Sequence, residues 1–489
     1  MTVTRSIEVK ISFVQHLLST AEGCHLGHST IDGLSDDVLL CVFNSYRQDS
    51  ESCLGMWPWG DLVHVCRRWR RIVFAFPRYL DLRLRCRSKT DAQATLDIWP
   101  RLPLGIYASL DDESDDEDDI IGTLEHRDRI NRIHLREFNH SQLKKCIALM
   151  QEPFPVLKSL ELLTGYTTVL VTASDAFKFL GGSAPLLQRI SLHGILFPSV
   201  PRFLSSASDL VHLSLCCIPL AGEGHLSPNV MTTCLSVSTK LRSLNLTLLP
   251  QRSSPYPTDQ HPPPSTHTVL PSLVNLRLEG PHGYLDDLVG RVDAPLLESG
   301  YLEFHSEPTF DTPRVPRFIH ATKMFKLLDK FEVSFYKGST NASFHSSISP
   351  ARFSLSFECS MLPAQVTIME RICAQWPPLV SLVEIFQLDN LFYEEEKWWE
   401  TVAPWLGFLR PFTAVQTLRL YGIDPVSHVT HMLGGLKGER ATKVLPALRT
   451  IELHCLEPGG SESLRLLEPF LVAREESEHP VAVDVGIRV

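Results

Sequence analysis

The chain has 489 residues, of which 44% are hydrophobic and 21% are charged. Its formal net charge of −10 argues against general nucleic-acid binding, because proteins that bind the phosphate backbone present a basic surface. No apolar run approaches the roughly 20 residues that cross a bilayer, so we expect no membrane span.

The 12 cysteines are scattered, without a CxxC pair or a dense disulfide framework. This pattern is typical of free thiols in a reducing compartment. The first residues also lack a convincing signal-peptide pattern. We therefore expect a cytoplasmic and/or nuclear protein.

After an N-terminal tail at residues 1–30, the sequence predicts a pair of helices within residues 31–84. The first begins with Ser35 as N-cap and with Asp36 and Asp37 in its first turn, where carboxylates suit the helix dipole. Its apolar stripe comprises Val38, Leu39, Val42, Phe43 and Tyr46.

The second helix is predicted to run as one segment until Pro77 ends it. One face carries Leu62, Val65, Cys66, Trp69, Ile72, Val73 and Phe76, and Arg67, Arg68, Arg70 and Arg71 lie away from the centre of that face. On pattern alone, the two helices form a hairpin whose apolar face is either its own core or a docking surface.

The order Leu-x-x-Asp-Val-Leu-x-x-Val-Phe at residues 34–43, followed by Val-Cys-x-x-Trp at residues 65–69, resembles an F-box. Ser35 stands where the family usually has proline, and the spacer at residues 47–60 is longer than the common form. The resemblance implies docking onto a Skp-type adaptor of a cullin ubiquitin ligase. The adaptor-binding residues that it implies are Leu34, Val38, Leu39, Val42, Phe43, Val63, Val65, Cys66 and Trp69.

Residues 85–489 carry an internal repeat of the form Leu-x-x-Leu-x-Leu. It appears at Ile130/Ile133/Leu135, Leu157/Leu160/Leu162, Leu187/Ile190/Leu192, Leu210/Leu213/Leu215, Leu241/Leu244/Leu246, Leu273/Leu276/Leu278, Val415/Leu418/Leu420 and Leu448/Ile451/Leu453. The first six starts are separated by 27, 30, 23, 31 and 32 residues. The pattern resembles an irregular leucine-rich repeat, and with the F-box-like segment it is similar to fungal F-box proteins with divergent repeats.

Between residues 278 and 415 the repeat weakens. Leu297/Leu302 and Leu328/Phe331/Val333 are interpreted as degenerate repeats, residues 353–357 as an alternating strand, and residues 394–409 as a helix. One continuous solenoid is the preferred interpretation, and two arrays with a distorted middle are the alternative.

Strand alternation places the residues between the leucines on the concave face of the sheet. These residues are mostly polar, and a solenoid uses such a face to bind another macromolecule. The candidate substrate-binding residues are Arg189, His193, His212, Asn245, Arg277, Arg419, Tyr421 and Glu452. For any single residue, plain solvation is the alternative explanation.

Two segments are predicted to lie outside the repeats. Residues 111–119 form an acidic block that repels itself, so we expect a solvated insertion with Ser114 inside it, between an early strand at residues 104–110 and the repeat at Ile130. Residues 250–271 are rich in Pro, Ser, Thr and His and predict an exposed loop.

No catalytic motif is convincing. Cys24, His25 and His28 make a weak metal candidate, His428 and His431 lack the glutamate and third ligand of a zinc protease, and residues 434–438 lack Walker spacing. We therefore expect no catalytic residue, no metal and no cofactor. A cysteine hydrolase assembled from dispersed residues is the rival enzyme class.

These observations predict an α/β protein with a small all-α F-box-like module followed by an irregular leucine-rich-repeat-like solenoid, in which a parallel sheet is covered by outer helices. The expected function is a non-catalytic, substrate-recognising subunit of a cullin-type ubiquitin ligase. Its expected partners are a Skp-family adaptor, through it a cullin, and a protein substrate, without nucleic acid or membrane. The alternative is a repeat scaffold without a ligase role.

Overall fold

The computed structural model describes residues 33–50, 58–76, 82–86, 92–98, 101–109, 117–164, 171–172, 178–196, 200–218, 226–249, 267–305, 314–390, 402–436, 438–455 and 460–487. The chain divides into two compact units, Met1–Arg83 (unit 1) and Leu84–Val489 (unit 2). The predicted N-terminal tail with Cys24, His25 and His28 lies outside the described residues, as do Ser114, residues 250–266 and residues 394–401. The end of the predicted exposed loop at residues 250–271 differs from the prediction, because Thr268 and Val269 form a short strand, and Thr268 and Leu270 are buried.

Unit 1 contains α2 (Asp36–Ser50), α3 (Pro58–Val65) and α4 (Arg67–Ala75). The start of α2 agrees with the prediction, because Ser35 Oγ accepts a hydrogen bond of 3.3 Å from the Val38 N–H. Asp36 and Asp37 occupy the first turn.

The predicted single second helix is wrong, because the chain forms two helices that meet at Cys66. Cys66 is extended, with φ −156° and ψ 170°, and its Sγ accepts from the Trp69 N–H at 3.4 Å. An extended residue ends the helical periodicity, so Val65 and Cys66 are exposed whereas Trp69 is buried. The periodic face expected across residues 62–76 is therefore divided.

Unit 2 is built on a sheet with 16 strands, whose first strand spans the boundary between the units. In spatial order the strands are β1 (Leu82–Arg85), β2 (Leu104–Ser109), β3 (Ile130–Phe138), β4 (Ser159–Thr164), β6 (Arg189–His193), β8 (His212–Ile218), β9 (Ser243–Leu248), β11 (Asn275–Gly280), β13 (Ser299–Phe304), β16 (Arg352–Cys359), β15 (Gly338–His345), β14 (Lys330–Tyr336), β17 (Ile385–Asn390), β18 (Thr417–Tyr421), β19 (Thr450–Cys455) and β20 (Ala482–Ile487). Two small parallel sheets pair β5 (Val171–Thr172) with β7 (Ile195–Leu196), and β10 (Thr268–Val269) with β12 (Val292–Asp293).

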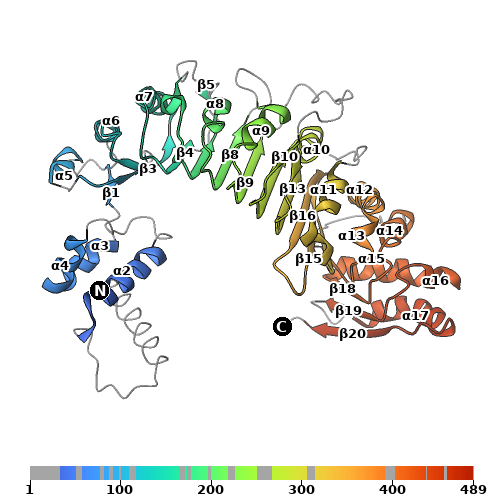
Figure 1. Cartoon of the computed structure of the whole chain (residues 1–489). Helices are drawn as coiled ribbons and strands as arrows, with labels where there is room; N and C mark the ends of the chain where they lie inside the picture. The colour runs from blue at the N-terminus through green and yellow to red at the C-terminus, as the bar shows by residue number, and fades with distance from the viewer. Residues whose placement is uncertain are drawn as a thin grey trace. The chain divides into compact units, whose positions relative to one another are not determined.

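Helices cover one face of this sheet, and within unit 2 the sheet curves with the helices on its outer side (Figure 1). They are α5 (Ala92–Ile98), α6 (Glu117–Leu124), α7 (His140–Leu149), η3 (Phe179–Gly182), α8 (Val200–Leu204), α9 (Pro228–Leu235), α10 (His282–Val289), α11 (Arg314–Ala321), η4 (Lys323–Leu327), α12 (Leu362–Gln375), α13 (Pro377–Val380), α14 (Val402–Leu409), α15 (Ile423–Gly434), α16 (Glu439–Lys443) and α17 (Gly460–Glu476). We call the face of the sheet opposite these helices the inner face.

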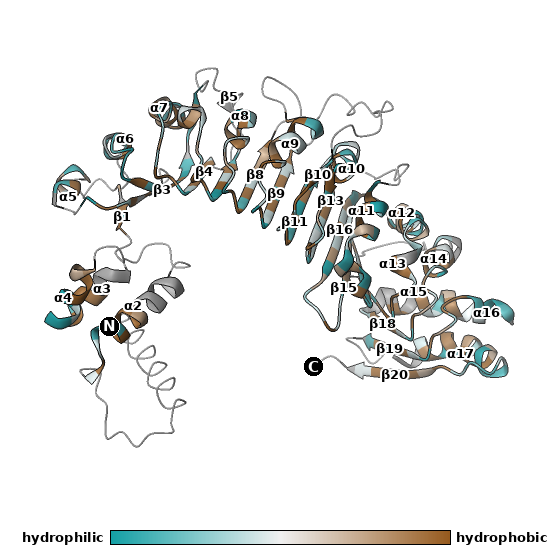
Figure 2. Ribbon diagram, viewed as in Figure 1, coloured by the Kyte–Doolittle hydropathy of each residue, from teal (hydrophilic) through white to brown (hydrophobic). Residues whose placement is uncertain are grey.

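The core lies between the sheet and the helices. On its sheet side, apolar residues of neighbouring strands align in rows, which we call leucine ladders. The strand register aligns Leu160, Ile190, Leu213, Leu244 and Leu276, and each is at most 4% exposed. Figure 2 shows the resulting alternation of hydrophobic and hydrophilic residues along strands such as β11 and β13. The predicted leucines therefore point to the core, and unit 2 is leucine-rich-repeat-like.

The middle of unit 2 is an antiparallel meander. β14 pairs with β15 and β15 with β16 in antiparallel register, whereas β16 joins β13 and β14 joins β17 in parallel. The three strands thus occur in reversed spatial order, with parallel strand pairs on both sides of them. The sheet is continuous, as preferred, but the predicted degenerate repeat at Leu328/Phe331/Val333 is one strand of this meander.

The acidic block differs from the expected solvated insertion at its end. Glu117, Asp118 and Asp119 form the first turn of α6, where carboxylates interact favourably with the helix dipole. Ile120 and Leu124 of the same helix are fully buried. The charged residues thus begin a helix whose next turn contributes to the core.

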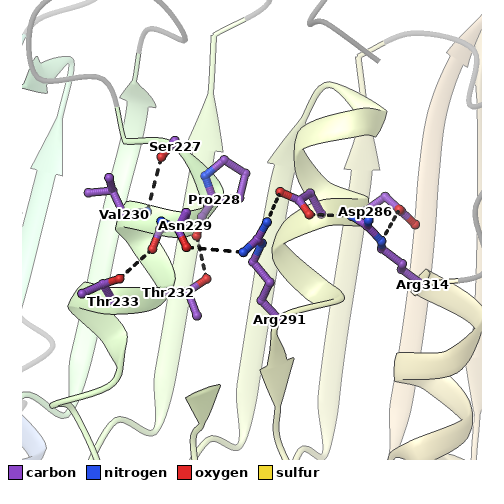
Figure 3. Close-up of polar contacts among 10 residues, drawn as sticks. Ser227, Pro228, Asn229, Val230, Thr232, Thr233, Asp286, Arg291 and Arg314 are labelled. Atoms are coloured by element: carbon purple, nitrogen blue, oxygen red, sulfur yellow. Dashed lines mark hydrogen bonds and ion pairs between the residues drawn. The ribbon is translucent and has the colours of Figure 1, made fainter. Parts of the chain in front are cut away.

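Ion pairs and a hydrogen bond connect three successive outer helices (Figure 3). Asp287 on α10 contacts Arg291 Nη2 at 3.1 Å through Oδ2 and Arg314 Nη1 of α11 at 2.5 Å through Oδ1. Arg291 Nη1 also donates to Asn229 Oδ1 of α9 at 3.4 Å. The Asp287 side chain is 5% exposed, so its ion pairs lie away from solvent, whereas the hydrogen bond to Asn229 ends at an exposed residue of α9.

Candidate binding surfaces

One continuous row of side chains crosses the inner face of unit 2. The strand register joins Tyr107, His134, Glu161, Ser191, Ser214, Asn245, Arg277, Tyr301, Ser354, Ser343, Glu332, Gln387, Arg419, Glu452 and Asp484. We call this the central row. Each of its residues is partly or fully exposed, and charged, amide, hydroxyl and aromatic groups alternate along it. The row is therefore an extended polar surface.

The register brings the predicted substrate-binding residues together in part. Asn245 pairs with Arg277, and Arg419 pairs with Glu452, all within the central row. Arg189 pairs with His212 in the row that lies two residues earlier on each strand. His193 and Tyr421 lie two residues later than the central row, on strands separated by the meander. The eight residues thus form an N-terminal and a C-terminal group.

Arg277 and Tyr301 form a preorganised part of the central row. The Arg277 guanidinium lies 4.2 Å from the centroid of the Tyr301 ring and also contacts Glu279. The Tyr301 hydroxyl donates to Glu303 Oε2 at 2.7 Å. Burial raises the pKa of Tyr301 to about 12, so the hydroxyl remains a donor at neutral pH. Tyr and Arg are the residue types that contribute most often to binding hot spots.

Tyr301 was not among the sequence candidates, because Leu297/Leu302 was interpreted as a degenerate repeat. The sequence feature that indicates its position is the alternation from Ser299 to Phe304, in which Gly300, Leu302 and Phe304 are buried and Tyr301 lies on the other face. Gly300 replaces the leucine expected in the ladder. A Cβ there would lie 2.9 Å from Phe353, which explains why a small residue is needed.

A second cluster lies at the N-terminal end of the central row. His134 Nδ1 contacts Glu161 Oε2 at 2.6 Å, Arg136 contacts Glu161 Oε1 at 3.2 Å, and the Tyr107 ring stacks on His134 with centroids 5.5 Å apart. Burial acts to raise the pKa of Glu161, but the hydrogen bond and charge of His134, with Arg136, outweigh it and lower that pKa. Glu161 is therefore ionised at neutral pH.

A third cluster lies on β18 and β19. Arg419 Nε donates to Glu452 Oε2 at 2.8 Å, and the Tyr421 and His454 rings stack with centroids 4.4 Å apart and an interplanar angle of 5°. This arrangement offers a flat aromatic surface beside an ion pair.

Arg189, His212 and Arg242 form a basic cluster at the start of β6, β8 and β9. Burial lowers the pKa of His212, and the charges of Arg189 and Arg242 lower it further. At neutral pH the two arginines therefore carry the charge of this cluster, and the His212 ring is neutral.

In unit 1 the predicted adaptor-binding residues fall into two groups. Leu39, Phe43, Val63 and Trp69 are buried, and the rings of Phe43 and Trp69 lie 4.8 Å apart. Val38 is 43% exposed, Val65 is 48% exposed, Cys66 is exposed, and Leu34 and Val42 are half-buried. The first group forms the core of unit 1, and the second group is accessible to a partner.

Arg68 has a role that the sequence pattern did not indicate. The pattern predicts that Arg68 lies away from the apolar stripe, but its guanidinium contacts Asp36 Oδ1 at 2.7 Å and donates to the Leu34 carbonyl. Arg70 Nε donates to the Val63 carbonyl at 2.9 Å. These contacts connect α4 to the start of α2 and to α3.

Residues 434–438, which lack Walker spacing, begin at the end of a helix. Gly435 among them is the C-cap of α15. Among the residues described, no group of three or more His, Cys, Asp or Glu side chains is arranged to hold a metal ion. Within the same part of the chain, no helix has the length and apolar character needed to cross a membrane.

No protein-family model and no curated protein matches this sequence. Among solved structures, the chain is similar to the leucine-rich repeat-containing protein LegL7 from Legionella pneumophila, with 10% identity and a TM-score of 0.26. The match covers 79% of this chain and 97% of that one. A likeness this weak carries no argument, so the leucine-rich-repeat-like description rests on the strand register and the buried ladders.

Proposed function

We propose that this protein is a non-catalytic recognition subunit that binds a protein substrate on the inner face of unit 2 and a Skp-type adaptor of a cullin ubiquitin ligase through unit 1. The observation that supports substrate binding best is the central row, a continuous polar surface across the sheet. A repeat sheet of this kind presents many side chains to one partner at once.

The Arg277 and Tyr301 pair is the proposed centre of the substrate surface. Its cation–π contact and the Tyr301–Glu303 hydrogen bond hold both side chains in place before binding, which lowers the entropic cost of binding. The clusters at Glu161 and Glu452 lie on either side of it along the row and add charge complementarity.

The adaptor surface is proposed on the resemblance of residues 34–43 and 65–69 to an F-box, together with the exposure of Val38 and Val65. Apolar side chains that remain exposed beside a packed core are suited to a protein partner. Phe43 and Trp69 support this surface from the core of unit 1, so their substitution would unfold the unit and would not report on binding alone.

The adaptor proposal is tested with full-length protein and a purified Skp-type adaptor. Val38→Asp combined with Val65→Asp is expected to weaken binding about 30-fold or more, because charges would be buried at the interface. Phe74→Ser is the matched control, since Phe74 is 52% exposed on α4 but is absent from the predicted set. Unchanged adaptor affinity in the double variant, with unit 1 still folded, would contradict the proposal.

A repeat scaffold without a ligase role is the alternative, and the central row supports it equally, because that surface requires nothing from unit 1. The two functions are separated by affinity purification from cells. A ligase subunit retains both adaptor and cullin, and loses both with the Val38 and Val65 changes. A scaffold retains its other partners and neither ligase component.

The substrate surface is tested by proximity labelling in the same cells. Arg277→Glu with Tyr301→Ala is expected to remove substrates from the labelled set while leaving the adaptor in it. Ser243→Ala, in a neighbouring row of β9, is the control. An unchanged labelled set would exclude this part of the central row as the binding centre.

A further inference from the structure

Two adjacent cysteines lie on the inner face at the end of β8. The strand register shifts between Leu215 and Ile218, and Cys217 has φ 58°, in the left-handed region. In a regular strand, adjacent side chains point to opposite faces. The bulge instead leaves both Cys216 and Cys217 half-buried and in contact with polar residues of the inner face.

The preceding strand shows what this backbone position favours. His193 on β6 pairs with Cys216, so the next residue, Gly194, corresponds to Cys217, and Gly194 has φ 68°. Glycine adopts this conformation without steric cost, whereas a residue with a side chain is strained there. Glu137, which follows the same row on β3, has φ 60°, so the position accepts a side chain at the cost of strain. Strained residues of this kind cluster at functional sites.

Polar groups surround both sulfur atoms. Cys217 Sγ and His193 Nε2 share a hydrogen bond of 3.3 Å. Asn245 Nδ2 donates to Cys216 Sγ at 3.5 Å, and the Ser214 hydroxyl lies 3.5 Å from the same sulfur. Other cysteines described in unit 2, at Cys86, Cys146, Cys234, Cys359 and Cys373, are buried. The adjacent pair is therefore the accessible thiol cluster among these residues.

We propose that Cys216 and Cys217 form a reversible dithiol site that a hydroperoxide oxidises to a vicinal disulfide, with His193 as the proton acceptor. The site requires neither the adaptor nor the substrate of the proposed function, so it can be tested on the isolated full-length chain.

The reaction balances with one hydroperoxide. Cys217 transfers its thiol proton to His193 Nε2, its sulfur attacks one peroxide oxygen, and the O–O bond breaks. This gives a sulfenic acid on Cys217, and the other oxygen leaves as an alcohol or water after taking the proton from His193. The Cys216 thiol then attacks the sulfenic sulfur, the S–S bond forms and the S–O bond breaks. Its proton leaves with the hydroxide as water.

Two physical features determine how this site behaves. Burial raises the pKa of Cys217, and Cys216 and Glu279 raise it further, so the thiol is protonated at neutral pH and its reaction depends on His193. Adjacent Cα atoms are about 3.8 Å apart, below the roughly 4.4–6.8 Å usual for disulfides. The disulfide is therefore strained and easily reduced, as expected of a reversible site.

The test exposes the full-length chain to hydrogen peroxide, blocks free thiols with N-ethylmaleimide, and analyses the peptides by mass spectrometry. Cys216 and Cys217 are expected to escape alkylation as an intrapeptide disulfide and to become alkylated again after dithiothreitol. His193→Asn is expected to slow this loss of alkylation about tenfold or more. His320→Asn, at an exposed position of α11 outside this contact, is the matched control and leaves the rate unchanged.

Cys217→Gly separates chemistry from folding, because glycine suits the backbone at this position. It is expected to retain the fold and to leave Cys216 open to alkylation after peroxide. Complete alkylation of both thiols in the peroxide-treated natural sequence would overturn the proposal. Disulfides formed exclusively between molecules, or an equal rate in His193→Asn, would overturn it as well.

Discussion

The parallel run from β4 to β13 and the meander formed by β14, β15 and β16 belong to one sheet but are stabilised by different contacts. In the parallel run, leucines occupy the same register on successive strands, and the Asp287 network joins the outer helices. In the meander, the rings of Phe331 and Phe344 pack across strands with centroids 4.6 Å apart and an interplanar angle of 49°. Gln365 of α12 bridges backbone groups there.

The comparison shows that the contacts between neighbouring strands depend on the direction of the strands as well as on the spacing of their hydrophobic residues. Gln365 Nε2 lies within hydrogen-bonding distance of the carbonyls of Tyr336, Ser339 and Cys359, at 3.0, 3.3 and 2.7 Å. One amide thus satisfies groups at the turn and ends of the antiparallel strands. In the parallel run a hydroxyl group makes a comparable bridge, because Thr164 Oγ1 at the end of β4 donates to the His193 carbonyl of β6 at 3.0 Å.

The largest expected effect is on the ion pairs of the parallel run. Asp287→Ala leaves the buried Arg291 without this carboxylate and leaves Arg314 with its longer contact of 4.0 Å to Asp286 Oδ2, and it is expected to lower the free energy of unfolding by about 3–5 kcal/mol. Urea denaturation of the full-length chain measures this loss. Asp293→Ala changes an exposed aspartate on β12 and is the control. Equal effects from the two substitutions would show that the network does not join the repeats.

A substitution in the row of buried leucines should lower the free energy of unfolding nearly as much as Asp287→Ala. Leu244→Ala removes a side chain that is 1% exposed and is expected to cost about 3 kcal/mol through lost burial and a residual cavity. The next residue, Asn245, faces the other side of the sheet, and Asn245→Ala should cost about 1 kcal/mol or less. Similar losses of stability, measured by urea denaturation, would contradict the assignment of the two faces.

The meander should respond locally to loss of Gln365. Gln365→Leu leaves buried carbonyl groups without this donor and is expected to cost about 1–3 kcal/mol. Hydrogen exchange should show faster exchange in β14–β16 and little change in β4–β13. Thr367→Val, on the same helix, is the control. Equal loss of protection along the whole sheet would mean that the two regions unfold as one unit.

The smallest expected effect is pH-dependent and concerns Glu161 in the parallel run. Its pKa is lowered in the folded state, so its contribution to stability is present above the unfolded value near about 4.3 and is lost as pH falls through the lower folded value. Glu161→Gln should therefore reduce the unfolding free energy at neutral pH by less than about 1 kcal/mol. The difference from the natural sequence should disappear in acid. A constant difference over that pH range would exclude a charge effect.

The sequence predicted the parallel run because its leucines occur at a spacing that strand alternation converts directly into a buried row. It also predicted the start of α2, where Ser35 caps the helix. It failed at Cys66, where residues 62–76 carry helical periodicity on both sides of an extended residue. Local pattern cannot detect one extended residue when the apolar spacing continues beyond it.

The residues of the candidate binding surface, like the secondary structure, were predictable from the sequence in part. Arg277, Arg419 and Glu452 were placed on the inner face by alternation alone, and the structure keeps them there. Tyr301 was missed because Gly300 replaces the expected leucine. The contact between Cys217 and His193 was also missed, because it joins residues on different strands through a bulge.

By itself, the sequence determined which residues of the regular strands enter the core and which remain on the surface, since hydrophobic spacing and the two-residue period of a strand are local properties. The tertiary structure decided the order of the strands at the meander, the Asp287 network and the thiol cluster. Each of these depends on which distant strands or helices become neighbours. That choice depends on packing and hydrogen bonding over the whole sheet, which no single segment encodes.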